Sequence, residues 1–260
     1  MAHMIKYILL GAYLHVSSSY VHVNPTAHGC SSSTSALPIS AQLDDEKSFF
    51  ALNEEEKGTV AALTLISGPL GTLLDSQHGC FNTLNYQWFP IIIESRGHIF
   101  LKTSIWVAPM FALAGLIMSY LTLKFDNILE ITFEKRDNSW SKVFAGIATF
   151  SSQYYLSGLM DASRVLDPNH IHVLLAAIAL VNYKIFDNTK SGLLLAIVTA
   201  VSGPIVEIGI INISKIYKYT NADFYGIDSW IPAVYFMGGA ALANLTRRIY
   251  LDKLGGSARQ

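Results

Sequence analysis

The stretch that decides the fold is Tyr217–Arg248, which reads YKYTNADFYGIDSWIPAVYFMGGAALANLTRR. Its apolar run, residues 227–245, is close to the length of about 20 residues that a helix needs to cross a bilayer. Trp230 stands at one end of the run, and Arg247 and Arg248 stand at the other, as aromatic and basic anchors do at the two membrane faces. The stretch therefore predicts a membrane-spanning helix.

The composition of the whole chain points the same way. Of 260 residues, 51% are hydrophobic and only 14% are charged, and the mean hydropathy is +0.35. A soluble domain of this length has too small an interior to hide so much apolar surface. The formal net charge of -1 and the lack of a dense Lys/Arg block argue against nucleic-acid binding.

Five further apolar segments precede this run, and each suits a helix of membrane-crossing length. The six predicted spans are residues 58–75, 101–123, 143–160, 170–186, 191–213 and 227–246. The chain before them is rich in Ser, Thr, Asn, Pro and acidic residues, a composition typical of disorder. We therefore expect an all-α, polytopic six-transmembrane-helix bundle at 58–250. A largely disordered cytosolic tail at 1–57 and a short cytosolic tail at 251–260 flank it.

Proline and glycine positions predict details of the helix packing. Pro109, Pro204 and Pro232 lie within the second, fifth and sixth spans, where we expect kinks. Gly238 and Gly239 in the sixth span allow a neighbouring helix to approach closely, as small residues do in membrane bundles.

The distribution of basic residues predicts the orientation of the bundle. With the N-terminus in the cytosol, and counting from Lys47 onward, twelve Lys and Arg residues outside or at the ends of the spans lie on the cytosolic side and five on the other. This excess favours a bundle with both termini in the cytosol. The loop 76–98 then lies on the opposite side. Its aromatic residues and three consecutive isoleucines predict that it sits in the membrane interface.

Several short motifs follow one another between residues 105 and 250. They are WVAP at Trp106–Pro109, FDNTKSG at Phe186–Gly192, YTNADF at Tyr219–Phe224, SWIP at Ser229–Pro232, and Gly238-Gly239 with Asn244 and Arg247. On these motifs the chain resembles the INSIG (insulin-induced gene) proteins of the endoplasmic reticulum. Its long N-terminal tail and its long loop between the first two spans are unlike the animal members. Both look like those of fungal or other microbial relatives.

The resemblance implies a non-catalytic regulator of sterol homeostasis in the endoplasmic reticulum membrane. INSIG proteins bind oxysterol and hold partners that carry a sterol-sensing domain. Those partners are SCAP, which escorts the SREBP transcription factor, and HMG-CoA reductase, and either or both fit the resemblance. The resemblance implies a sterol or other lipid as regulatory ligand, with no cofactor and no metal.

Asp187, in the FDNTKSG motif, has two interpretations. From the residues alone it turns or caps the chain before Ser191 and Gly192 begin the fifth span, because Asx side chains bond nearby backbone groups. The resemblance implies a second role, because the equivalent aspartate of INSIG proteins contributes to partner binding. We expect an exposed Asp187 that contacts the partner and contributes little to folding.

Four further residues are candidates for a sterol pocket. The resemblance places His170 where a polar residue lines the INSIG sterol pocket, and Tyr183 where a tryptophan lies beside the sterol. Gln153 and Tyr154, on the polar face of the third span, suit the other pocket wall. From the residues alone, His170 marks an interfacial helix end and Tyr183 an interfacial anchor. His170 and His172 stand on different helix faces, so we expect no shared metal.

Glu207, inside the fifth span, is not explained by the resemblance. A carboxyl group in a membrane helix is by default a functional candidate, either a proton or an ion site. It can also be held protonated against the backbone carbonyls that Pro204 leaves free. We expect the structural role, because we expect no second intramembrane carboxylate beside Glu207.

A different class of function is a small membrane transporter or a lipid-modifying enzyme. It would use Glu207 together with a polar cluster of Asp161, Arg164, Asp167 and His170 on the non-cytosolic side. The cluster lacks a nucleophile or a metal set, so a solvated loop is the simpler interpretation. The chain also has no GxSxG, HExxH or P-loop motif, and we therefore expect no enzyme.

Overall fold

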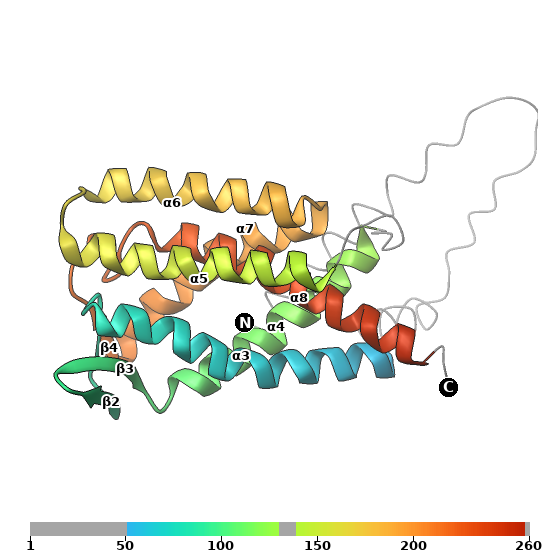
Figure 1. Ribbon diagram of the computed structural model, residues 1–260, viewed down its shortest axis with the longest axis horizontal. Helices are drawn as coiled ribbons and strands as arrows, with labels where there is room; N and C mark the ends of the chain where they lie inside the picture. Colours follow the sequence, from blue (N-terminus) through green and yellow to red (C-terminus); the bar gives the residue numbers. More distant parts are fainter. Residues whose placement is uncertain (1–50, 130–138, 258–260) are drawn as a thin grey trace, which may run out of the picture.

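The computed structural model describes residues 51–129 and 139–257. Six helices make up most of these residues (Figure 1). They are α3 (Glu54–Cys80), α4 (Val107–Ile128), α5 (Trp140–Ser163), α6 (Pro168–Asn182), α7 (Lys190–Gly209) and α8 (Ile231–Ser257). Short π-helical turns extend α6 over Tyr183–Asp187 and α7 over Ile210–Ser214. All six predicted spans coincide with a helix, so the all-α membrane bundle is confirmed.

Four of the helices are long and apolar enough to cross a membrane on their own, namely α3, α4, α6 with its π turn, and α7 with its π turn. The other two carry more polar residues. Helix α8 runs among the other helices, and buries Met237, Ala243, Thr246 and Arg247 completely. Its polar side chains therefore meet protein rather than lipid, as intramembrane polar residues require.

The helices run back and forth between two ends of the bundle (Figure 1). One end holds the strands and the α5–α6 turn, and we call it the strand end. The other holds the start of α3, the α6–α7 turn and the end of α8, and we call it the terminal end. Helix α3 begins at Glu54, four residues before the predicted span, because Asn53 and Glu56 form a capping box. Most of the predicted 1–57 tail lies outside the described residues.

The strand end carries two small antiparallel sheets. Strand β1 (Leu84–Tyr86) pairs with β4 (Tyr217–Tyr219), and β2 (Pro90–Ser95) forms a hairpin with β3 (His98–Ser104). The prediction that the second span begins at residue 101 is wrong, because β3 occupies that stretch and α4 starts at Val107. The β-branched isoleucines of β2 and the positive φ of Arg96 and Gly97 favour a hairpin there.

Two of the three prolines that we expected to kink a helix do not interrupt one. Pro109 and Pro232 lie in the first turns of α4 and α8, where a helix has no backbone N–H bond to lose. Pro204 does lie inside α7, and Pro69 lies inside α3. The expected close packing at Gly239 is confirmed, since a Cβ there would stand 2.4 Å from Thr199 Oγ1 of α7.

Candidate functional site

Gln153 and Tyr154, the two predicted pocket residues of α5, point into the bundle. Gln153 is 1% exposed, and its Nε2 donates to the Leu175 carbonyl of α6 at 2.9 Å. Its Oε1 is buried and has no hydrogen-bond partner among the described residues. The Tyr154 ring stacks on His78 of α3, with ring centroids 4.3 Å apart. Gln153 therefore ties α5 to α6, and its Oε1 lies unbonded inside the bundle.

His170 and Tyr183 lie at opposite ends of α6. Thirteen residues separate them, which is roughly 20 Å along a helix. The exposed His170 ring pairs with Asp167, whose side chain also caps the helix. Tyr183 donates to the Thr189 carbonyl at 2.9 Å in the α6–α7 turn. The structure does not gather His170 and Tyr183 in one place, and a ligand that touches both must be elongated and lie along α6.

Asp187 is buried, which corrects the expectation that it is exposed. The residue is 4% exposed, and its Oδ1 accepts from Arg247 Nη1 of α8 at 3.0 Å and from Thr189 Oγ1 at 2.6 Å. Gly192 has no side chain and so leaves room for the Asp187 carboxylate, because a Cβ at position 192 would stand 1.8 Å from Asp187 Oδ2. The reason is the tertiary fold, which brings α8 against the α6–α7 turn.

Arg247 is the centre of a buried ionic network at the terminal end. Its Nε and Nη2 donate to the two carboxylate oxygens of Asp126 in α4 at 2.7 and 2.9 Å. Nη2 also donates to Ser191 Oγ of α7 at 2.9 Å. With the bond to Asp187, one guanidinium joins α4, α7, α8 and the α6–α7 turn. Buried charges persist in this way only when they are paired and hydrogen-bonded.

Glu207 of α7 is held by tyrosines rather than by backbone carbonyls. Its carboxylate accepts from Tyr219 at 2.8 Å and from Tyr235 at 3.0 Å. A second carboxyl group, Asp75 of α3, is close enough to act on it electrostatically, and Tyr86 donates to Asp75. The expectation that no other intramembrane carboxylate accompanies Glu207 is therefore wrong, because strands β1 and β4 pair, and their Tyr86 and Tyr219 bond Asp75 and Glu207 respectively.

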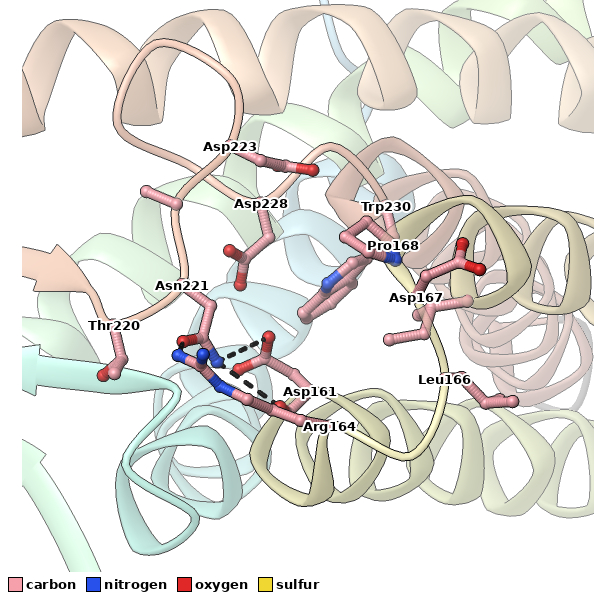
Figure 2. A pocket seen from close by; sticks show the side chains of 12 residues that line it. Asp161, Arg164, Leu166, Asp167, Pro168, Thr220, Asn221, Asp223, Asp228 and Trp230 are labelled. Atoms are coloured by element: carbon pink, nitrogen blue, oxygen red, sulfur yellow. Dashed lines mark hydrogen bonds between the residues drawn. The ribbon is translucent and has the colours of Figure 1, made fainter.

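A cavity of about 490 Å³ opens at the strand end (Figure 2). Its charged lining comes from Asp161 of α5, Arg164 directly after α5, Asp167 before α6, and Asp223 and Asp228 in the segment before α8. Three members of the predicted polar cluster thus meet around one cavity. Glu207 and His170 are not among its lining residues, so the structure divides the set proposed for a transporter or enzyme.

Asp228 stands out among the lining residues. It is 2% exposed, and neither carboxylate oxygen has a hydrogen-bond partner among the described residues. Burial raises the pKa of Asp228 to about 8, and the neighbouring Asp161 and Asp223 charges add to the rise. Asp223 differs, because it accepts from the backbone N–H and the hydroxyl of Ser229 at 2.6 and 2.8 Å.

Several of these residues were not found from the sequence. Asp126 lies near the end of an apolar helix, and Asp228 lies in a loop-like stretch, IDSW. Two signals were available. Arg247 directly follows the last predicted span, 227–246, and an arginine so close to a membrane helix has either water or a carboxylate as its partner. Tyr217 and Tyr219 alternate along YKY, which predicts one shared face of a strand. Neither pattern identifies the partner, because Asp187 and Asp126 are 60 and 121 residues from Arg247, and Glu207 lies in a different element from Tyr219.

Comparison with curated proteins finds the insulin-induced gene 1 proteins. The Xenopus tropicalis protein is 28% identical over 144 residues, which are 55% of this chain and 55% of that protein. The Homo sapiens protein is 28% identical over the same length, which is 50% of that protein. The chain thus spans about half the length of the curated relatives it matches. No family model matches the chain.

Solved structures of an Insig homologue share the fold. The protein MvINS from Mycobacterium vanbaalenii superposes with a TM-score of 0.59 over 74% of this chain and 95% of that chain, at 18% identity. A cross-linked trimer of MvINS gives a TM-score of 0.58. The resemblance to the INSIG proteins is thereby confirmed, in sequence over about half of the chain and in fold over most of it.

Proposed function

We propose that this chain is a non-catalytic membrane regulator of sterol homeostasis. It binds an oxysterol or a related lipid and retains or regulates a partner with a sterol-sensing domain, a SCAP-type escort, HMG-CoA reductase or both. The observation that carries the proposal is the similarity to insulin-induced gene 1 proteins on a shared membrane fold. The ligand, the partners and the endoplasmic reticulum location are parts of this proposal.

The α5–α6 layer supports the sterol part of the proposal. Its outer surface is apolar, with exposed Phe144 and Leu159 on α5 and Val173 and Val181 on α6. Apolar contact supplies most of the affinity for a rigid lipid, at roughly 25 cal/mol per Å², and a few polar groups orient it. Gln153 Oε1 is an acceptor that a sterol hydroxyl can use. With Tyr154 it would form the inner wall, and His170 and Tyr183 would mark the two ends.

A labelled oxysterol that can be photo-crosslinked tests this site in purified protein. We expect Gln153→Leu to reduce specific labelling several-fold, because the variant removes the acceptor. Ser152→Leu, which changes the exposed neighbour on α5, is the matched control and should label normally. Equal labelling of both variants at equal folded yield would remove Gln153 from the site.

The partner part of the proposal concerns the α6–α7 turn. Asp187 is buried, so we propose that it acts as a positioning residue. It fixes the turn whose exposed side chains, Lys184 and Asn188, contact the partner. Asn188 adopts a left-handed conformation with φ 57°, and the Asp187 bonds to Arg247 and Thr189 hold the neighbouring backbone.

Two isosteric variants separate partner binding from stability. Asp187→Asn and Asp126→Asn each remove one charge that faces Arg247, and Asp126 makes two of the three ionic bonds. We expect Asp126→Asn to lower the free energy of unfolding at least as much as Asp187→Asn does. Only Asp187→Asn should lose co-precipitation of the sterol-sensing-domain protein at matched abundance. Equal loss in both variants would reduce Asp187 to a folding residue.

The proposed orientation places both termini in the cytosol and the strand end in the lumen. In sealed microsomes, protease should then remove a C-terminal tag without detergent. Survival of the tag until detergent is added would reverse the orientation. In the same preparation, Lys102 of β3 should be protected from protease until detergent is added, because the strand end then lies in the lumen.

The transporter or enzyme alternative rests on the cavity at the strand end. Because Glu207 is bonded to two tyrosines, Glu207→Gln should keep partner capture nearly intact. Complete loss of cellular function in this variant at normal abundance, or turnover by the purified protein alone, would favour the alternative.

A further inference from the structure

We propose that the cavity at the strand end binds an organic ammonium group, held between the carboxylates of Asp161 and Asp228. This site goes beyond the regulatory function proposed above, because the cavity contains none of the residues Gln153, Tyr154, His170, Tyr183 or Asp187. Its occupant is either a soluble amine or the headgroup of a lipid, which share the ammonium chemistry.

Unsatisfied carboxylate oxygens are the first reason. Asp228 is 2% exposed and Asp161 is 6% exposed. Both oxygens of Asp228 and Oδ2 of Asp161 are buried without a hydrogen-bond partner among the described residues. Leaving such groups unpaired costs more than a typical hydrogen bond contributes. Figure 2 shows the Asp228 carboxyl group directed toward the space beside Asp161 and Asn221.

The electrostatics of the cavity select a cation. Four carboxyl groups line it, those of Asp161, Asp167, Asp223 and Asp228, against the single guanidinium of Arg164. That guanidinium is already bonded to Asn221. Asp161 also lies in the last turns of α5, where the helix presents its negative dipole end.

The remaining lining selects an organic cation over a metal ion. The described residues contain no group of three or more His, Cys, Asp or Glu side chains arranged to hold a metal. Trp230 lines the cavity beside Asp228, and Leu166 and Ile171 add apolar surface. Aromatic faces stabilise ammonium groups, and apolar walls accommodate the attached carbon atoms.

The test is a titration of choline chloride into the purified full-length protein in a maltoside detergent, which carries no ammonium. Isothermal titration calorimetry should show saturable binding, and an equal concentration of calcium chloride should give none. Asp228→Asn and Asp161→Asn should each weaken binding by at least about tenfold, as truncation of one member of a buried charge pair does. Asp252→Asn is the matched control, because Asp252 lies partly exposed near the end of α8, at the terminal end, and does not line the cavity. It should change the affinity by less than about threefold.

The pH dependence gives a second measurement. Choline keeps its charge at all pH values. Burial, together with the charges of Asp161, Asp223 and Glu207, raises the pKa of Asp228 to about 8, and Arg164 and Asp167 also line the cavity. Wild-type affinity should therefore rise between pH about 6 and about 9. Asp228→Asn should lose this rise.

Repeating the titration in nanodiscs identifies the source of the ammonium group. Competition by phosphatidylcholine, but not by phosphatidylglycerol, assigns the site to a lipid headgroup, and equal affinity in both assigns it to a soluble amine. The proposal is overturned if choline and ethanolamine both fail to bind. It is also overturned if calcium binds as well as choline, or if both Asp→Asn variants bind like the wild type.

Discussion

The two ends of the bundle treat buried charge in opposite ways. At the terminal end, Arg247 joins Asp126 and Asp187 by ionic hydrogen bonds of 2.7 to 3.0 Å, and every one of these side chains is almost fully buried. At the strand end, Asp228 is equally buried, but its oxygens have no partner among the described residues. One end is complete by itself, whereas the other is arranged to receive a positive charge.

The difference matters because buried charge is stable only when it is paired. A completed network fixes neighbouring helices, and the Arg247 network joins α4, α7 and α8. In an incomplete network, a ligand that pairs with the unbonded carboxylates gains binding free energy. The completed network at the terminal end therefore supports the architecture and the shape of the α6–α7 turn, and the carboxylates at the strand end remain open to a cationic ligand.

Removing Arg247 should have the largest effect. Arg247→Ala leaves two buried carboxylates without a counter-charge, and breaking a buried pair in this way costs about 3–5 kcal/mol. Denaturant or thermal unfolding in detergent micelles measures the change. Arg248→Ala is the control, because Arg248 pairs with the partly exposed Asp252 and should cost about 1 kcal/mol or less. If the Arg247 variant is no less stable than the control, the completed network does not hold the terminal end together.

Gly192→Ala should have the next largest effect. The added methyl carbon would stand 1.8 Å from Asp187 Oδ2, so the turn or the network must shift, at about 1–3 kcal/mol. Gly209→Ala in the same helix meets no atom within 4 Å and should leave unfolding unchanged or slightly improved. Equal stability of both variants would show that the turn adapts and that Asp187 is not held rigidly.

Asp228→Asn should raise the free energy of unfolding, whereas Arg247→Ala and Gly192→Ala lower it, and the change should be smaller. Because burial raises the pKa of Asp228 to about 8 from 3.8, the folded chain keeps a proton that the unfolded chain has lost. The free energy of unfolding of the wild type therefore falls as pH rises from about 4 to about 8. Because the surrounding chain relaxes around a buried charge, the variant should gain roughly 1–2 kcal/mol at pH about 9, less than the full pKa shift would give.

Unfolding measured across this pH range tests the sign. At pH about 4 the variant and the wild type should have similar stability, because Asp228 is then protonated in the folded state. A wild type that is the more stable of the two at alkaline pH would show that Asp228 already has a counter-charge. The strand end would then be as complete as the terminal end.

The smallest effect is expected in the hairpin of the strand end. Ile92 is 53% exposed on β2, so Ile92→Ser should change the free energy of unfolding in detergent by no more than about 0.5 kcal/mol. Leu84 on β1 is 2% exposed, and Leu84→Ala should cost about 2–4 kcal/mol. Similar losses in both would mean that β2 packs against the bundle rather than facing the membrane interface.

The sequence by itself determined the membrane bundle. Apolar runs of about 20 residues identify helices that must satisfy their backbone bonds internally, and this needs no knowledge of neighbours. All six runs became helices, and the motifs led to the INSIG resemblance that the comparisons confirm. The hairpin β2–β3 was missed, because an apolar stretch of β-branched residues is ambiguous until its turn is recognised.

Only the tertiary structure decided how the charged residues are used. Asp187 looked exposed at the end of a span, and Arg247 looked like a membrane anchor, yet the two meet 60 positions apart in sequence and bury each other. Glu207 looked solitary, yet strand β4 brings it a tyrosine and Asp75 lies close by. Hydrophobic pattern is a local property of the chain, whereas pairing depends on which helices lie side by side. For this reason the positions of the helices follow from the sequence, whereas the packing determines which charged groups are paired within the chain and which remain unpaired.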